Sequence, residues 1–193
     1  MRKIVVSEFV TLDGVIQDPG GVGEIERGGW NIPYVNDEFA KYKFDELSAS
    51  DALLLGRVTY QGFAAAWPDA SHTETEGDYA TMMNSYPKYV VSTTLDKAAW
   101  NNSHLIKANV VEEVSKLKQQ PGKDILVFGS GELVQMLMQH GLIDEYHLQV
   151  HPVVLGSGKR LFGEGSTTTL KLVETQTFRS GVVALAYQPA QRE

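Results

Sequence analysis

The sequence of 193 residues contains no cysteine. This absence excludes disulfide bonds, thiolate metal sites and thiol nucleophiles, and it fits a reducing compartment such as the cytoplasm, where we expect the protein. The sequence also lacks runs of lysine or arginine, and its net charge of −7 opposes the basic surface that nucleic-acid binding needs. It has no apolar stretch long enough to span a bilayer. These absences leave a small molecule as the expected partner.

The composition that remains is typical of a globular protein, with 42% hydrophobic and 21% charged residues. The length suits one compact domain, which we expect to cover residues 1–193. Short apolar runs that end in glycine or hydroxyl residues alternate with helical patterns along the chain. Strands are predicted at 4–12, 52–55, 88–92, 125–128 and 146–155, helices at 37–47, 58–66, 110–119 and 132–140, and a hairpin at 170–187.

The alternation of strands and helices predicts an α/β fold with helices on both faces of a mainly parallel sheet and an antiparallel C-terminal hairpin. Residues 69–78 are acidic and lack large hydrophobic side chains, so they are predicted to form an exposed loop. In open parallel sheets, ligands bind beyond the carboxyl ends of the strands. The search for function therefore begins at those ends.

Three predicted strand ends carry small, hydroxyl or basic residues, at 56–59, 92–94 and 129–131. Gly129, Ser130 and Gly131 open a helix, where exposed N–H groups attract phosphate, although the full G-x-G-x-x-G pattern is not met. A plain tight turn is the alternative for this loop. Arg57 begins another helix and suits bidentate phosphate binding; a solvated surface charge is its alternative.

Two further patterns are weaker. The segment 156–159 resembles part of a P-loop but lacks its first glycine and its magnesium-binding hydroxyl, which excludes nucleotide hydrolysis of that type. His147 and His151 share one strand face, but no third ligand stands at a suitable spacing, so a structural role is favoured and no metal site is predicted.

Together these motifs resemble the dihydrofolate reductase superfamily, and within it the branch of the C-terminal reductase domain of riboflavin biosynthesis (the RibD C-terminal type) and its stand-alone relatives. The resemblance extends from residue 4 to residue 187 and implies a single-domain three-layer dihydrofolate reductase-like fold. The motifs that carry it are Thr11-Leu12-Asp13-Gly14, Gly56-Arg57-Val58-Thr59-Tyr60, Ser92-Thr93-Thr94, Gly129-Ser130-Gly131-Glu132-Leu133, and Pro152 to Gly158 after Gly141-Leu142-Ile143-Asp144-Glu145.

The resemblance implies NADPH as hydride donor, with the protein supplying position and electrostatics. It places Arg57 on a phosphate of the adenosine side, assisted by Ser92 and Thr93. The full set of implied cofactor-binding residues is Gly56, Arg57, Thr59, Ser92, Thr93, Gly129, Ser130, Gly131, Glu132 and Leu133. The nicotinamide is expected beside the first strand, along residues 6–13.

On the substrate side, Trp30 and Pro33 resemble the Trp-x-x-Pro segment that precedes the substrate-binding carboxylate in dihydrofolate reductases. Asp37 is the first candidate for that carboxylate, and an acid that favours a helix N-terminus is its alternative. Asp13 is the second candidate, and a turn carboxylate that caps backbone N–H groups is its alternative. Three residues separate Pro33 from Asp37, which speaks against folate itself.

The sequence therefore predicts an NADPH-dependent reductase of a small pteridine- or pyrimidine-like heterocycle or a related carbonyl compound. A nucleotide-binding protein without catalysis on the same fold is one alternative, and a side activity on antifolates or drugs without a dedicated substrate is another. The resemblance also implies a homodimer that pairs through the sheet edge and the C-terminal strands.

Overall fold

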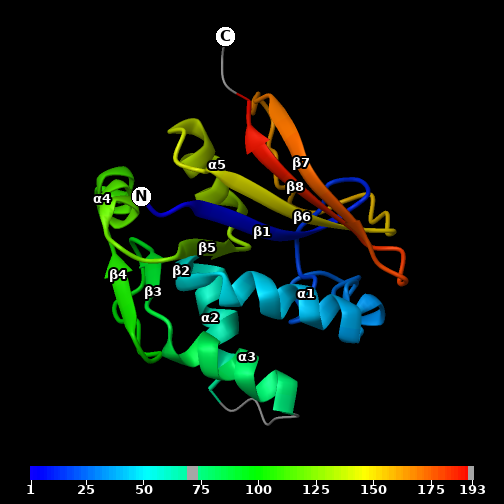
Figure 1. Cartoon of the computed structure of the whole chain (residues 1–193), viewed down its shortest axis with the longest axis horizontal. Coiled ribbons are helices and arrows are strands. Elements are labelled where there is room, and N and C mark those ends of the chain that lie inside the picture. The colour runs from blue at the N-terminus through cyan, green and yellow to red at the C-terminus, as the bar shows by residue number, and fades with distance from the viewer. Residues whose placement is uncertain (69–73, 191–193) are drawn as a thin grey trace.

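The computed structural model describes residues 1–68 and 74–190, with residues 74–77 described by their backbone alone. Eight strands form one sheet in the order β4-β3-β2-β5-β1-β6-β8-β7 (Figure 1). The strands are β1 Ile4–Thr11, β2 Ser50–Gly56, β3 Lys88–Val91, β4 Ser103–Ile106, β5 Asp124–Phe128, β6 Glu145–His151, β7 Leu170–Thr177 and β8 Val183–Pro189. The first six strands of that order run parallel, as predicted.

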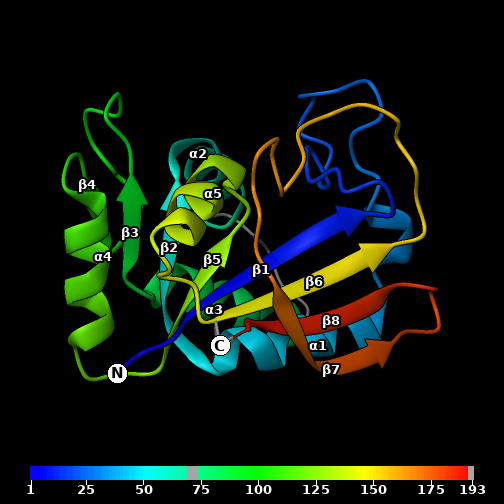
Figure 2. The ribbon, with the colours of Figure 1, turned by 90° about the horizontal axis from the view of Figure 1, so that it is seen from above.

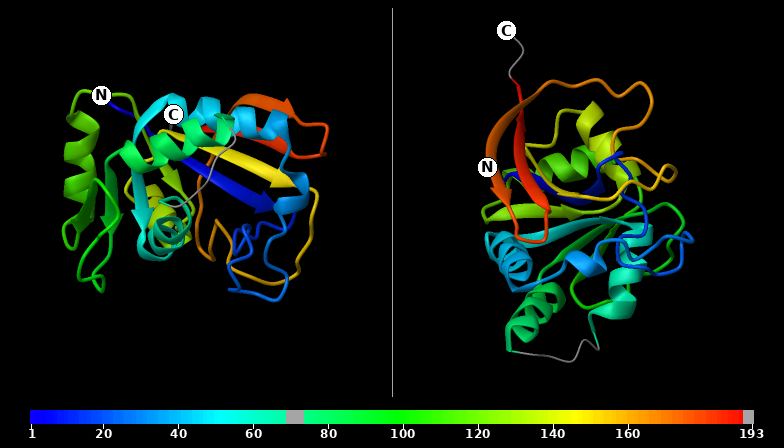
Figure 3. Two further views of the ribbon diagram at one scale, coloured as in Figure 1. Left: turned by 90° about the horizontal axis from the view of Figure 1, so that it is seen from below. Right: turned by 90° about the vertical axis from the view of Figure 1, so that its right-hand side faces the viewer.

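Helices cover both faces of the sheet and make three layers (Figures 1 and 3). The helices are η1 Ile32–Tyr34, α1 Asp37–Ser48, α2 Arg57–Ala66, α3 Glu74–Ser85, α4 Val110–Gln119 and α5 Gly131–Gln139. Helices α4 and α5 pack on one face, and α1, α2 and α3 pack on the other. The predicted three-layer α/β architecture is confirmed.

Alternate residues of the central strands supply the two cores. Leu54 and Val127 point to the face of α4 and α5, while Leu53 and Leu126 point to the opposite face, and all four are fully buried. Strands that bury both faces need continuous apolar runs, which is why the runs of β2 and β5 were readable in the sequence. The N-terminus of α1 is also as predicted, because the Asn36 side chain accepts a hydrogen bond from Phe39 N at 2.9 Å.

The C-terminal hairpin adds the antiparallel edge that the sequence indicates. Strand β8 pairs antiparallel with β6 and with β7, and Gly181, with φ of 89°, forms the turn between β7 and β8 (Figure 2). Strand β7 is the edge, and residues 171–177 are exposed. None of the helices in the described part of the chain is long and apolar enough to cross a membrane.

Three sequence predictions are wrong at particular elements. Helix α3 begins at Glu74, inside the segment predicted as a loop. The prediction failed because the first turn of the helix carries no apolar residue, and its buried residues, Ala80 and Met83, come later. The rest of that predicted loop, residues 69–73, lies outside the described residues. Strand β4 was missed because a short, half-exposed edge strand shows no apolar run. Strand β6 ends at His151, since Pro152 has no N–H to donate to a neighbouring strand.

Two long loops lie side by side at the carboxyl end of β1. The loop that follows β1 forms an isolated bridge between Val15 and Arg160, which belongs to the loop after β6. Ile16 N also donates to Lys159 O at 2.9 Å. Figure 2 shows these loops together beyond the tips of β1 and β6. They lie at the edge of the sheet where ligands bind in folds of this type.

Candidate functional site

The sheet opens between β1 and β5. Strand β1 pairs with β5 only from Ile4 to Ser7, whereas its pairing with β6 continues to Thr11. Residues 8–11 of β1 therefore extend past the end of β5, which stops at Phe128. Gly129 and Ser130 follow with φ of 54° and 66°, a left-handed conformation that a strand cannot continue.

Two helices begin side by side at this opening. Helix α2 starts directly after β2, with Gly56 as its N-cap, and α5 starts after β5, with Ser130 as its N-cap. Gly56 has no side chain to cap α2, and the Ser130 side chain accepts no hydrogen bond from the N–H groups of α5. The first N–H groups of both helices are therefore left to bind a ligand, and the helix dipoles favour an anion there.

The two helix starts are fastened together by Ser130. Its Oγ accepts a hydrogen bond from Gly56 N at 2.7 Å and donates to Thr59 Oγ1 at 3.0 Å. A Cβ on Gly56 would lie 2.8 Å from Ser130 Oγ, and one on Gly129 would lie 2.8 Å from Thr59 Oγ1. Only glycine fits at these positions, so both loops keep bare backbone at the opening.

Gly131 faces the other loop of the site. A Cβ there would lie 2.9 Å from Ile16 Cδ1, so this glycine lets the loop after β1 approach the start of α5. The side chains of the next two residues play no part in the opening. Glu132 is exposed, and Leu133 is buried in the core. They can offer the site only their backbone N–H groups. The structure brings Gly56, Thr59, Gly129, Ser130 and Gly131 together at the opening.

The remaining predicted cofactor residues lie around this cluster. Arg57 is exposed in the first turn of α2 and donates to Gln61 Oε1 at 3.1 Å. Ser92 is buried at the end of β3, where its Oγ accepts from Thr94 N at 3.2 Å and Leu95 N at 3.0 Å. Thr93 beside it is exposed. Arg57 and Thr93 are thus open to a ligand, whereas Ser92 shapes the turn.

An aromatic cage forms where the predicted substrate segment meets β6. The rings of Trp30, Tyr34, Phe9 and Phe39 surround His151, with centroids 5.2 to 5.9 Å from its ring. His151 is fully buried, and burial lowers the pKa of its imidazole. Trp30 Nε1 donates to Gln17 O at 2.8 Å, while Pro33 is exposed in η1.

The two candidate carboxylates lie in different surroundings. Asp13 accepts hydrogen bonds from Thr11 Oγ1 at 2.6 Å and from Gly156 N at 2.7 Å, and these bonds lower its pKa to about 2. It therefore fastens the loop after β6 to the end of β1, which matches its turn alternative. Asp37 is exposed at the start of α1, and its carboxylate has no hydrogen-bond partner among the described residues. It lines an open cleft of about 450 Å³ together with Arg179.

The sequence analysis missed Glu8, the first residue of β1 beyond the end of β5. Its side chain alternates with that of Ser7, so it points to the face of Val6 and Val10. It is 4% exposed, and its Oε1 has no hydrogen-bond partner among the described residues. Burial raises its pKa to about 8, against the opposing charge of Lys43. The signal was present as a lone acid in an apolar strand.

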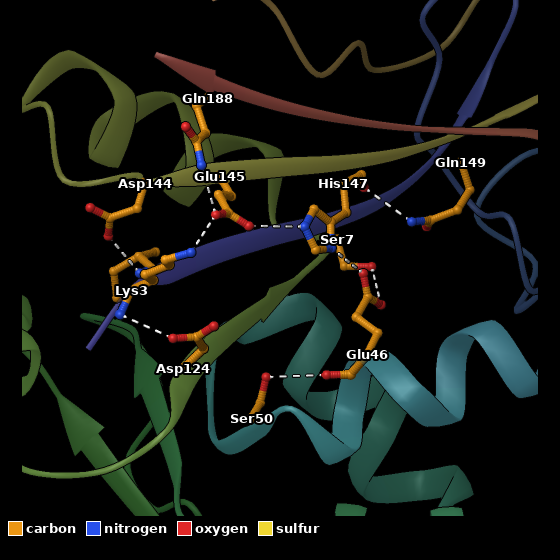
Figure 4. A network of polar contacts seen from close by, with 11 residues as sticks. Lys3, Ser7, Glu46, Ser50, Asp124, Asp144, Glu145, His147, Gln149 and Gln188 are labelled. Carbon is orange, nitrogen blue, oxygen red and sulfur yellow. Dashed lines mark hydrogen bonds and ion pairs between the residues drawn. The ribbon is translucent and has the colours of Figure 1, made fainter. Parts of the chain in front are cut away.

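A second missed feature lies on the other face of β1. Lys43 and Glu46 of α1 are buried and form an ion pair, and Lys43 Nζ also donates to Ser7 Oγ. His147 Nδ1 lies 2.9 Å from Glu46 Oε1, and His147 Nε2 lies 3.3 Å from Glu145 Oε2. Figure 4 shows His147 between the two carboxylates. The helical spacing does place Lys43 and Glu46 on the face of Phe39 and Leu47, but charged residues on a helix are usually exposed, so the pair was not singled out.

The neighbouring charges shift the pKa values of Glu46 and His147. Burial opposes the charge of Glu46, but Lys43 and His147 together lower its pKa below the ordinary value. Burial likewise opposes a charge on His147, but Glu46 and Glu145 raise its pKa above 6.5. Glu46 therefore stands between two cationic partners, Lys43 on one carboxylate oxygen and His147 on the other. No cluster of three metal-ligating side chains is found in the described parts of the chain.

Comparison with known families identifies the chain. The model of the RibD C-terminal domain matches residues 2–184. The chain belongs to the RibD C-terminal domain family. A sequence relative of this family member is the uncharacterized protein YyaP of Bacillus subtilis (strain 168), 38% identical over 187 residues, which are 96% of this chain and 94% of YyaP. The resemblance inferred from the motifs is thereby confirmed.

Solved structures agree with the fold of this family. A pyrimidine reductase-like protein of Corynebacterium diphtheriae has a TM-score of 0.65 at 13% identity, covering 99% of this chain and 93% of its own. Dihydrofolate reductase of Enterococcus faecalis, in a complex with NADP(H), has a TM-score of 0.62 at 15% identity, covering 98% and 97%. The chain therefore has the fold of the RibD C-terminal domain and of dihydrofolate reductase.

The raised pKa of Glu8 yields a test on stability. The folded protein keeps the Glu8 proton that the unfolded chain releases above its ordinary value of 4.5. The stabilisation is full below that value and is lost as pH rises to about 8. Compared with Glu8→Gln, the wild type should lose up to about 1.4 kcal/mol per pH unit in that window, measured by urea unfolding. The exposed control Glu164→Gln should follow the wild type, and parallel curves for wild type and Glu8→Gln would contradict the assignment.

Proposed function

We propose that this protein is an NADPH-dependent reductase that transfers a hydride to a small pteridine- or pyrimidine-like heterocycle or to a related carbonyl compound. It would act as one domain spanning residues 1–193, in the cytoplasm. The observation that carries the proposal is the pair of uncapped helix starts, α2 and α5, which Ser130 holds together at the opening of the sheet. Membership of a reductase-like family supports the same reaction class.

The residues at the opening fit a phosphorylated dinucleotide. Glycine at positions 56, 129 and 131 leaves backbone N–H groups accessible where a side chain would collide with a neighbour. Gly129, Ser130, Gly131 and the backbone of Glu132 and Leu133 would hold the pyrophosphate. Arg57, with Thr59 and Thr93, would hold the phosphate on the adenosine side, and Ser92 would assist by shaping the turn that carries Thr93. The bound cofactor supplies the hydride, and the chain supplies its position.

The substrate would lie along β1, between the opening and the segment that contains Trp30 and Pro33. Trp30 forms part of the aromatic cage of His151, a wall suited to a planar ring. Asp37 is proposed to hydrogen-bond the ring, because its carboxylate is free and faces an open cleft. Asp13 would contribute indirectly, by fixing the loop after β6.

Two copies are proposed to pair through the exposed edge of the sheet. Strand β7 is unpaired on its outer side within the described chain and exposes Leu172 by 47% and Val173 by 54%. Edge strands of this kind invite pairing with another strand.

Replacing Arg57 by Ala tests the cofactor site. We expect NADPH affinity to fall about 10- to 100-fold, because one charge-assisted contact to phosphate is lost, while NADH affinity changes little. The measurement is a fluorescence titration. Lys41→Ala, which removes a cation from the exposed side of α1, is the matched control and should bind NADPH like the wild type. Absence of NADPH and NADH binding in the wild type would overturn the reductase proposal.

Oxidation of NADPH with 7,8-dihydrofolate or 5-amino-6-(5-phosphoribosylamino)uracil tests the substrate class. We expect the uracil compound to react and dihydrofolate to react poorly. Asp37→Asn should lower kcat/KM about 10-fold or more, since a hydrogen bond from the ring to a charged group is weakened. The neighbouring Glu38→Gln serves as control. Tight NADPH binding without reduction of either compound would favour a nucleotide-binding protein without catalysis.

Replacing Val173 by Lys tests the pairing of two copies. A charge on each β7 edge should convert the dimer to a monomer, because two like charges would meet across the new strand pair. Light scattering after size-exclusion chromatography gives the mass. Thr167→Lys, outside the strand, is the control. A wild-type monomer at all concentrations would rule out the dimer.

A further inference from the structure

Buried charges connect a cavity at the surface to the opening between β1 and β5. The cavity has a volume of about 140 Å³ and lies between α1 and the hairpin, with His147 and Glu46 in its wall. The His147 side chain is 21% exposed, whereas the side chains of Glu46 and Lys43 are 4% and 10% exposed. His147, Glu46 and Lys43 therefore form a row that leads from the cavity, which water reaches, into the protein interior.

The contacts along this row are continuous. His147 Nδ1 meets Glu46 Oε1 at 2.9 Å, and the other oxygen of the same carboxylate pairs with Lys43 Nζ. On the far side of His147, Nε2 meets Glu145 Oε2 at 3.3 Å (Figure 4). Every neighbour in the row is joined to the next by a hydrogen bond along which a proton can move.

Lys43 ends the row at the opening of the sheet. Its Nζ lies 4.9 Å from the ring centre of Phe128, the last residue of β5, and 5.3 Å from that of Phe9, which lies past the end of β5. The ammonium group has three N–H donors, and the described residues accept two of them, at Ser7 Oγ and Glu46 Oε2. The third can point to a molecule bound at the opening.

We propose that His147, Glu46 and Lys43 form a proton relay, in which Lys43 delivers to the bound heterocycle a proton that enters from the cavity at His147. The inference rests on the proposed function, because reduction of a C=N or C=O bond consumes one proton besides the hydride. Bound NADPH would supply the hydride for the new C–H bond from a C–H bond of its nicotinamide, and would leave as NADP+. A Lys43 N–H bond breaks, and an N–H or O–H bond forms on the substrate.

The relay then returns to its starting state by taking up one proton from solvent. Glu46 accepts the proton of the His147 imidazolium on Oε1, its carboxyl group turns, and the proton passes to the Lys43 amine. Water that reaches the cavity then protonates His147 again. Lys43 is thus the catalytic acid, whereas Glu46 and His147 act through it. An ion pair between Lys43 and Glu46 that only stabilised the fold would not need hydrogen bonds that continue through His147 to the cavity. This continuous path is the feature that a relay requires.

The charged groups around His147 favour its protonation. From α1 they are Glu46, Asp45 and the phenol of Tyr42, from its own strand Glu145, and from β7 Glu174, while β8 presents only Ala184 and Ala186. The neighbouring strand β1 presents the hydroxyl of Ser7. The carboxylates of Glu46 and Glu145 therefore favour the protonated form of His147.

Turnover tests the relay once an acceptor is in hand. Lys43→Met should lower kcat about 100-fold with NADPH affinity within a few-fold of the wild type, because a general acid is lost. His147→Gln should lower kcat about 10-fold and abolish the fall in rate that the wild type shows as His147 loses its proton. Lys41→Met, on the exposed side of α1, is the matched control. The double variant Lys43→Met/Glu46→Gln, which buries no unpaired charge, guards against misfolding of the single one.

Nitrogen NMR of the imidazole tests the relay without turnover. Removing the Lys43 cation should raise the pKa of His147 by about one unit, since both groups share Glu46. An unmoved pKa, or unchanged turnover in His147→Gln, would overturn the relay even if NADPH binds. NADPH binding without reduction of either acceptor would also overturn it, because no proton would then be consumed. Failure of NADPH binding would instead overturn the proposed function, and the titration would still judge the coupling of Lys43 to His147.

Discussion

The structure depends on the early end of β5. Phe128 is followed by two residues in the left-handed conformation, so the hydrogen bonding of β5 to β1 stops there, while β1 continues along β6. A sheet that parts in this way exposes strand and helix ends in the middle of the domain rather than at its rim. The starts of α2 and α5, the buried Glu8 and the end of the Lys43 row all lie at this opening.

Polar groups are concentrated at the same place at a cost in stability. Glu8 Oε1, Gln149 Oε1 and His151 Nε2 are buried on β1 and β6 and lack hydrogen-bond partners among the described residues. Each such atom costs about 1–3 kcal/mol of folding free energy. The apolar layers on both faces of the sheet offset this cost. Buried polar atoms without hydrogen-bond partners are rare in folded proteins, and such atoms call for a functional explanation.

The sequence was most informative where one residue type had one physical reason. The run 125–128 and the N-cap at Asn36 each follow from a local rule, and both are confirmed. The sequence was least informative about charge. Lys43 and Glu46 share the helix face of Phe39 and Leu47, but only the packing of α1 on the sheet shows that both charges are buried and paired.

The amino-acid sequence by itself determined the layers, the order of helices and strands apart from α3 and β4, and the family, because apolar periodicity and turn residues act over a few positions. Tertiary structure alone decided how the sheet parts and which charges are buried. In the folded chain Asp13 accepts a hydrogen bond from Gly156 N and so holds the loop after β6, while Asp37 lines a cleft. His147 and Lys43 contact the two oxygens of the Glu46 carboxylate. These outcomes depend on contacts between residues as much as 143 positions apart, which no local pattern in the chain encodes.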